Sequence, residues 1–215
     1  MPQNKGRRLS PEIYDASTVL RLLKAMPNYN TNPVHGRDRA LFAFLWRTGV
    51  RVVELPEIRA SDLDREAGTV RIRRSKQRPG RDAVLFGSDD SIDWCWEQLE
   101  PWLTKRAERS IRKHQPLFCV IDGRTRGAAL GAPQIRTALK GYAERAGLRG
   151  RFHPAGFRST LAHELYEANV PVTQIQQQLG HSSVSVTQAL LERLGIVQPA
   201  VELHEYRPGW SSTDV

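Results

Sequence analysis

The apolar periodicity of this chain restricts its fold more than any other feature, because it is helical along most of the sequence and changes only once. Between Thr69 and Phe86 apolar and charged residues alternate, and the turn-forming residues 77–80 (QRPG) separate the two halves of that segment. A two-residue repeat is typical of a half-exposed strand, whereas the repeat elsewhere is typical of helices that bury one face. We therefore expect a mainly α-helical fold with one small antiparallel β-sheet, an α+β class.

Glycines mark the ends of several helical segments, because glycine adopts the left-handed conformation that closes a helix at little cost. Gly49, Gly147, Gly180 and Gly195 each follow an apolar-periodic run. The expected helices cover, in order, residues 10–26, 38–48, 52–58, 92–103, 132–146, 153–168, 172–179 and 185–194.

One folded unit is expected, because no low-complexity tract or strong domain boundary interrupts the 215 residues. The basic residues 1–9 precede the first periodic segment and are expected to form a flexible arm. Residues 10–195 carry the periodic pattern and form the domain. Residues 196–215 are weakly periodic and form a C-terminal tail.

Positive charge is concentrated in three clusters, and the formal net charge of the chain is +9. Excess Lys and Arg favour a polyanionic partner, because each cation set against a phosphate releases a condensed counterion. Many basic proteins carry such charge for solubility alone, so the placement of the charge matters more than its total. The clusters consist of Arg71, Arg73, Arg74, Lys76, Arg78 and Arg81 in the predicted hairpin, of Lys105, Arg106, Arg109, Arg112 and Lys113, and of Arg145, Arg149, Arg151 and Arg158.

Several classes of protein do not fit this sequence. Cys95 and Cys119 are too few and too far apart for a disulfide framework or a zinc knuckle, and no metal or cofactor is expected. Residues 1–12 lack the apolar stretch of a secretory signal, and the longest apolar run, residues 40–46, is far too short to span a membrane. The expected location is the cytoplasm, in association with the nucleoid, with no membrane partner.

Breaking a DNA phosphodiester without a metal requires a small set of side chains. Two arginines neutralise the phosphoryl oxygens, since each guanidinium can bond two oxygens. A lysine can protonate the leaving oxygen, a histidine can position or shuttle a proton, and a tyrosine can attack phosphorus. Most of this set is present in the sequence.

Four segments of the sequence carry these side chains. In chain order they are RTGVRVVEL (residues 47–55), SKQR (75–78), FRSTLA (157–162) and LGHSS (179–183). Together they resemble the motifs of the tyrosine recombinases, the phage-integrase family. His181 lies 23 positions after Arg158, a spacing common in that family, and Lys76 lies 25 positions after Arg51, in the place of its lysine hairpin. Each segment is weak evidence by itself, and the shared order makes the resemblance strong. It covers about residues 9–195 and implies the catalytic-domain fold of that family.

The resemblance also implies a partner and a binding site. The partner is double-stranded DNA, and one of its phosphates is expected to be held by Arg51, Lys76, Arg158 and His181. Further DNA contacts are expected from three arginines of the hairpin, Arg73, Arg78 and Arg81.

These positions also have purely structural interpretations. Arg51 lies at a helix end, where it can pair with Glu54 or Glu57. His181 can cap a helix turn. The register of the hairpin could slip by one or two residues, so the basic neighbours of Lys76 compete with it for the role.

Two positions depart from the family pattern. Leu190 stands nine residues after His181, where the family carries its nucleophilic tyrosine, and leucine has no oxygen that could attack phosphorus. Ala155 stands three residues before Arg158, where the family usually carries a histidine. His153 is displaced from that position by two residues, which turns its side chain well away at the start of a helix. The sequence therefore identifies no catalytic residue.

The expected function is that of a DNA-binding protein of this family that does not cleave DNA by itself. It would act as a regulator or accessory subunit in recombination or integration, with an active relative or by self-association on DNA. The alternative is an active recombinase that uses Tyr206 or a tyrosine supplied in trans; Tyr206 more simply packs the tail. A third interpretation is a protein-interaction scaffold. The separate N-terminal domain common in the family is expected to be missing, which would weaken DNA affinity.

Overall fold

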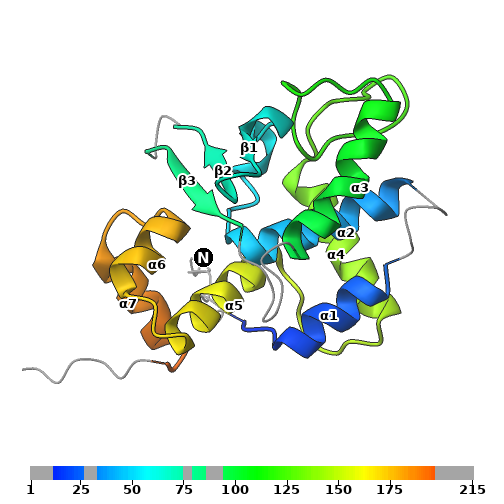
Figure 1. Cartoon of the computed structure of the whole chain (residues 1–215). Helices are drawn as coiled ribbons and strands as arrows, with labels where there is room; N and C mark the ends of the chain where they lie inside the picture. Colours follow the sequence, from blue (N-terminus) through cyan, green and yellow to red (C-terminus); the bar gives the residue numbers. More distant parts are fainter. Residues whose placement is uncertain (1–11, 27–32, 75–78, 86–93, 197–215) are drawn as a thin grey trace, which may run out of the picture.

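The computed structural model describes residues 12–26, 33–74, 79–85 and 94–196 (Figure 1). Its α-helices are α1 (Ala16–Lys24), α2 (Pro33–Thr48), α3 (Trp94–Glu108), α4 (Ala132–Arg145), α5 (Pro154–Glu167), α6 (Val172–Leu179) and α7 (Val184–Arg193). Two 3-10 turns, η1 (Leu55–Glu57) and η2 (Ala60–Asp62), lead from α2 to a sheet of β1 (Leu63–Asp64), β2 (Thr69–Ile72) and β3 (Arg81–Val84). The expected mainly helical fold with a small sheet is confirmed.

The sheet is antiparallel, in the strand order β1-β2-β3. Val70 pairs with Ala83, and both side chains are buried, whereas Arg71 between the core residues of β2 is exposed. This is the alternation expected from the sequence, because successive side chains of a strand point to opposite faces. Residues 75–78 and 86, which belong to the predicted hairpin, lie outside the described residues.

The segment 52–58 is not the α-helix that its pattern predicted. It contains only η1, and its bonds join residues three apart, from Glu57 N to Glu54 O and from Ile58 N to Leu55 O. Pro56 has no N–H and is compatible with the first turn of a helix but not with its interior, so the segment stays a single tight turn.

The largest other differences from the predicted helix boundaries are at the start of the first helix, the start of the second and the end of the helix predicted at 92–103. The first helix starts at Ala16 instead of residue 10, because the Asp15 carboxylate accepts a hydrogen bond from Thr18 N at 2.7 Å and caps it there. The second starts at Pro33, and proline fits the first position of a helix. The helix predicted to end at residue 103 continues to Glu108.

The core lies around α2, which passes through the middle of the molecule between α3 and α5 (Figure 1). Every residue from Ala40 to Val50 is buried. Large side chains fill this core: Phe42, Phe44, Trp46, Trp102, Phe118 and Phe157. Each contributes roughly 1.5–3 kcal/mol to the free energy of folding. The packing of these side chains fixes the positions of the neighbouring elements relative to α2.

A second, smaller apolar cluster joins α5, α6 and α7, at the left of Figure 1. Its buried members are Leu161, Ala162, Leu165, Ile175, Leu179, Leu190 and Leu191. Because α5 belongs to both clusters, it fixes the end of α6 relative to the end of α2.

The segment before α1 is bound to α5 and the residues just before it by hydrogen bonds and ring packing of Tyr14. Tyr14 N donates to Thr160 Oγ1 at 2.8 Å, and the Tyr14 hydroxyl donates to His153 O at 3.0 Å. The ring stacks on Phe152 and lies so close to Gly156 that a Cβ there would overlap it.

None of the described helices has the length and apolar character needed to cross a bilayer.

Candidate functional site

Three arginines meet at the C-terminal end of α6, one from the segment after α2, one from β3 and one from α5. We call Arg51, Arg81 and Arg158 the guanidinium cluster. Each donates to a different one of three successive carbonyl oxygens: Arg81 Nε to residue 178 at 3.1 Å, Arg158 Nη2 to residue 179 at 2.6 Å, and Arg51 Nη2 to residue 180 at 3.1 Å. The last carbonyls of a helix lack helical donors and carry partial negative charge, so the end of α6 gathers the cations.

Two glycines allow this close approach. Gly180 ends α6 in the left-handed conformation, with φ +58°, and a Cβ there would lie 2.6 Å from the Arg81 guanidinium. Gly49 ends α2 with φ +63°, and a Cβ there would lie 2.7 Å from a methyl carbon of Leu179. Arg158 Nη1 donates to Gly49 O at 2.6 Å, so this buried guanidinium joins the ends of both helices. The helix-ending role expected for both glycines is confirmed.

Glu54 joins two members of the guanidinium cluster. It accepts two hydrogen bonds from Arg81, each 3.0 Å long, and two from Arg51, from the main-chain N at 2.9 Å and from Nη1 at 3.1 Å. Burial raises the pKa of Glu54, but the hydrogen bonds and charge of Arg81, followed by those of Arg51, outweigh it and lower the pKa to about 2. The carboxylate is therefore ionised at neutral pH, and it offsets only part of the positive charge.

His181 lies beside the guanidinium cluster. Its Nδ1 is 2.8 Å from the Oγ1 of Thr187, which is fully buried on α7. Burial, followed by the positive charges of Arg158, Arg51 and Arg81, lowers the pKa of His181 to about 3. The imidazole is therefore neutral at physiological pH and serves as a hydrogen-bonding group and not as a cation.

Gln178 holds α6 against the sheet edge and the end of α2. Its side-chain amide donates to Thr48 O at 3.0 Å and to Val84 O at 2.9 Å, and it accepts from Val84 N at 2.9 Å. One buried side chain thus gives β3 the partner that an edge strand lacks. It also satisfies a carbonyl at the end of α2.

The other predicted DNA contacts have separate positions. Arg73 pairs with Asp62 of η2, with Nε 3.2 Å from Oδ2, at the opposite side of the sheet from α6. Lys76, Arg78 and Tyr206 lie outside the described residues.

The two departing positions lie on α5 and α7. Leu190 is 8% exposed and packs in the α5–α7 cluster. Ala155 is exposed in the first turn of α5. His153 caps that helix, with Nδ1 accepting from Ala155 N at 3.2 Å, and burial and the nearby arginines Arg136 and Arg151 lower its pKa.

Three of the four residues predicted to hold a phosphate, Arg51, Arg158 and His181, lie near one another at the end of α6. Glu54 entered only as a structural partner for Arg51, and that pairing is present. Gln178 and Thr187 were not singled out. Their signal was their position, directly before the LGHS segment and one turn before Leu190. Within the described residues, no group of His, Cys, Asp and Glu side chains could hold a metal ion.

Comparison with known proteins identifies the family to which this fold and site belong. The model of the phage integrase family matches residues 13–192, and the chain belongs to this family. It is 35% identical over 158 residues to tyrosine recombinase XerC of Oceanobacillus iheyensis, which covers 74% of this chain and 50% of the relative. It is 31% identical to tyrosine recombinase XerD of Bifidobacterium longum, over 86% of this chain and 59% of the relative.

Solved structures share the fold. The XerH site-specific recombinase bound to palindromic difH substrate in a post-cleavage complex matches with a TM-score of 0.69 and 21% identity, over 86% of this chain and 50% of that one. The XerA recombinase matches with a TM-score of 0.67 and 22% identity, over 98% of this chain and 68% of that one. The chain spans little more than half the length of the XerC and XerD relatives that it matches.

Proposed function

We propose that this chain binds double-stranded DNA as a tyrosine recombinase family member that does not cleave DNA by itself, and that it acts as a regulator or accessory subunit in recombination or integration. The observation that carries the proposal is the guanidinium cluster beside a neutral histidine, together with a leucine in the place of the nucleophile. The proposal keeps the expected domain plan, with an arm at residues 1–9, a domain at 10–195 and a tail at 196–215, and the expected association with the nucleoid.

The arrangement of charge suits a phosphate. Three guanidinium groups lie beside one ionised carboxylate, and this concentration of positive charge favours an anionic ligand. Arg51 and Arg158 supply planar donors that match phosphate oxygens, and a neutral His181 can donate or accept one hydrogen bond. Lys76, which lies in sequence between β2 and β3, is proposed to complete the site.

Binding and cleavage make different demands. A hydrogen bond to a charged group contributes roughly 1.5–3 kcal/mol, and these residues can supply several of them. Removing the nucleophile of a catalytic unit costs on the order of a millionfold in rate. DNA binding can therefore persist with Leu190 in place, whereas cleavage by the family's route cannot.

The known relatives support the choice of DNA. XerH and the lambda integrase, which matches with a TM-score of 0.65, are described as bound to their DNA sites. Active relatives also offer a partner for an accessory subunit, because related chains of one fold can assemble on one DNA site.

A binding assay with duplex DNA at several salt concentrations tests the first half of the proposal. Arg51→Ala is expected to weaken binding roughly tenfold and to reduce the dependence of log Kd on log salt by about one unit. Arg71→Ala, which removes an exposed arginine of β2, is the matched control and should change binding less. If the unaltered chain does not bind DNA at low salt, the scaffold interpretation gains and this proposal fails.

A nicked substrate that traps covalent intermediates tests the second half. No phosphotyrosine adduct is expected with the chain alone. An adduct mapped to Tyr206, or strand exchange that depends on this chain in a mixture with an active relative, would support the alternative of an active recombinase.

A further inference from the structure

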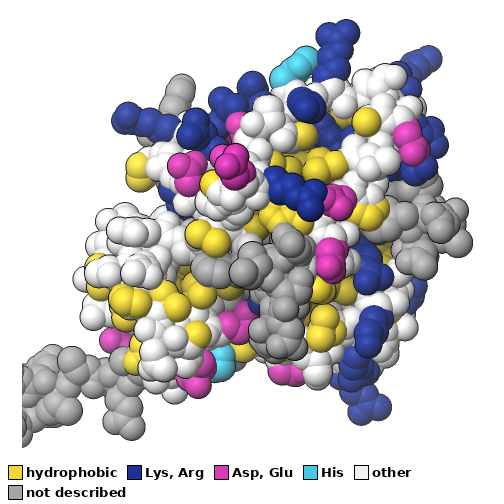
Figure 2. Space-filling model, viewed as in Figure 1, with side chains coloured by type: hydrophobic (Ala, Val, Ile, Leu, Met, Phe, Trp, Pro, Cys, Tyr) yellow, Lys and Arg dark blue, Asp and Glu magenta, His cyan; other side chains and the backbone are white. Residues whose placement is uncertain are grey.

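Two loops that follow α3 present a group of basic side chains away from the guanidinium cluster. Residues 109–117 form the first loop, and residues 121–130 form the second (Figure 1). Exposed side chains on them are Arg112, Lys113, His114, Arg124 and Arg126. Lys and Arg side chains line the upper rim of the molecule in Figure 2, over the sheet and over these loops.

A buried arginine gives the first loop a fixed shape. Arg106 of α3 is 2% exposed, and its guanidinium donates to main-chain carbonyls of the loop: to Leu117 O at 2.8 Å, to Arg112 O at 3.1 Å and to Gln115 O at 3.4 Å. The Gln115 side chain also accepts from Arg112 N at 2.7 Å. These bonds satisfy the loop carbonyls internally, so the loop holds its exposed side chains in one arrangement.

The second loop is held against the first. Gly127 lies so close to the Gln115 amide that a Cβ would overlap it, and φ at Gly127 is +85°. Arg109 of the first loop pairs with Asp122 of the second, with Nη1 2.6 Å from Oδ1. The basic residues of both loops therefore belong to one surface, which we call the loop surface: Arg112, Lys113, His114, Arg124 and Arg126.

The positive charge of the loop surface is not balanced locally. In the part of the chain that the structure describes, Asp122 is the acidic residue of these loops, and it is already paired with Arg109. Arg112, Lys113, Arg124 and Arg126 form no ion pair with another described residue, unlike Arg71, Arg73 and Arg81 in the hairpin. A rigid, unpaired cationic surface is better suited to a polyanion than to solvent alone.

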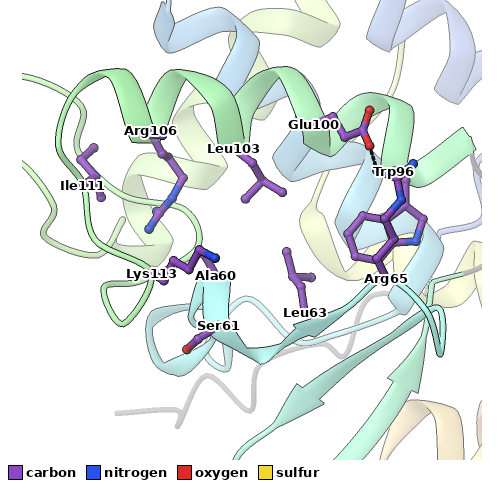
Figure 3. Close-up of a pocket in the computed structure, with 11 residues that line it drawn as sticks. Ala60, Ser61, Leu63, Arg65, Trp96, Glu100, Leu103, Arg106, Ile111 and Lys113 are labelled. Carbon is purple, nitrogen blue, oxygen red and sulfur yellow. Dashed lines mark hydrogen bonds and ion pairs between the residues drawn. The ribbon is translucent and has the colours of Figure 1, made fainter.

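The loop surface adjoins the sheet. Lys113 O accepts from Ser61 N at 3.0 Å, next to Asp62, which holds Arg73. Figure 3 shows this junction at one end of a cavity of about 540 Å³ between α3 and the η2–β1 segment, where Lys113 lies beside Ala60 and Arg106 reaches toward the loop. The sheet thus has the guanidinium cluster at its β3 edge and the loop surface at its β1 edge.

We infer that the loop surface is a second contact for the DNA backbone, which binds phosphates away from the one held by the guanidinium cluster. This inference rests on the proposed DNA-binding function. Neighbouring strands lie about 4.8 Å apart, so the two contacts are separated by roughly 10 Å or more across the sheet. Successive phosphates of one DNA strand advance by about 3.4 Å along the axis, which puts the second contact about three or more nucleotides from the first.

Paired charge removals test this inference in the full chain. Arg112→Gln with Lys113→Gln removes two charges from the loop surface. Arg21→Gln with Lys24→Gln removes two exposed charges from α1, at the other side of the molecule in Figure 1, and is the matched control. All four side chains are exposed, so both variants should fold, which a thermal melt checks. Kd is measured against salt on one duplex of about two helical turns, roughly 20 base pairs, which is long enough for both contacts.

The loop variant is expected to bind the duplex roughly tenfold more weakly than the unaltered chain does. The slope of log Kd against log salt should fall by about 0.9 for each phosphate that the protein no longer neutralises. The α1 variant should change either value much less. Equal reductions in both variants, or none in the loop variant, would overturn the inference while leaving the proposed function in place. Failure of the unaltered chain to bind the duplex would overturn both.

Discussion

At the scale of single residues, Glu54 is the group that determines how Arg51 and Arg81 lie. It is 10% exposed and accepts four hydrogen bonds from these two residues. A glutamine at this position keeps the shape of the side chain but replaces one acceptor oxygen with a donor, which would face a guanidinium. The charge of Glu54 therefore contributes to stability and to the direction of both arginines.

Glu54 contributes to the pH dependence of stability. Its folded pKa of about 2 is below its ordinary value of 4.5, so its contribution is complete above about pH 4.5 and is lost as pH falls toward 2. The contribution is on the order of 3 kcal/mol. Glu54→Gln should be less stable than the unaltered chain at pH 7, and the difference should shrink between pH 4.5 and 2. Urea unfolding at a series of pH values measures both, and a pH-independent difference would contradict this origin.

Leu190 offers a test of why the chain should not cleave DNA. It lies one turn after Thr187 on α7, and Thr187 contacts His181, so both positions lie on the face toward the site. Leu190→Tyr would bring a hydroxyl to that face, and we expect it to form a slow covalent adduct with a nicked substrate. The unaltered chain is expected to form none. Adding Ala155→His should increase the rate.

Leu190→Phe is the matched control, because it adds the ring without the hydroxyl and should give no adduct. If Leu190→Tyr binds DNA as the unaltered chain does and still forms no adduct, then more than this side chain separates the protein from its active relatives.

At the scale of secondary-structure elements, the site depends on α6. This helix is short, so its position has to be fixed by contacts with other elements. Eight residues make a marginal helix, so its place depends on the cluster with α5 and α7 and on Gln178. The three carbonyls at its end can gather the guanidinium cluster only if that place is fixed.

Gln178→Ala is therefore expected to destabilise the fold by about 2–3 kcal/mol, because three hydrogen bonds disappear and two carbonyls become unsatisfied. The amide of Val84 should also exchange with solvent faster, since it would lose its acceptor. Hydrogen exchange measures this locally. Gln177→Ala, at an exposed position of the same helix, is the control and should change neither value appreciably.

At the scale of the whole molecule, Tyr14 connects the segment before α1 to α5. Its main-chain N donates to Thr160, which lies 146 positions further along the chain. Tyr14→Ala should lower the free energy of unfolding by about 3–5 kcal/mol, because it leaves a cavity beside Phe152 and Gly156. Ile13→Ala, at a neighbouring position that is 36% exposed, should cost much less. Chemical unfolding of both variants checks the difference, and equal destabilisation would contradict a specific role for the ring.

The sequence predicted the parts of the fold that depend on local pattern. The change of period predicted β2 and β3, and Gly49 and Gly180 predicted two helix ends that shape the site. The motifs also identified Arg51, Arg158 and His181 as neighbours. The phosphate-binding roles of Arg51, Lys76, Arg158 and His181 stay predictions, as does any role of Tyr206.

Interactions between distant residues were not predictable in this way. Gln178 reaches Thr48 across 130 positions, and nothing in the pattern around either residue indicates the other. Periodicity tells which face of an element is buried but not which element covers it. The segment 52–58 shows a local failure, because apolar spacing alone did not weigh the effect of Pro56.

The three carbonyls at the end of α6 have a consequence for the thermodynamics of binding. An arginine side chain that is free to rotate loses about 2 kcal/mol of rotamer entropy when it is immobilised. Here Arg51, Arg81 and Arg158 are ordered by the protein's own backbone, so this loss is incurred during folding and would not recur on binding of the proposed phosphate. Association is then expected to be fast and to have a small conformational entropy cost at these side chains, as in a rigid receptor.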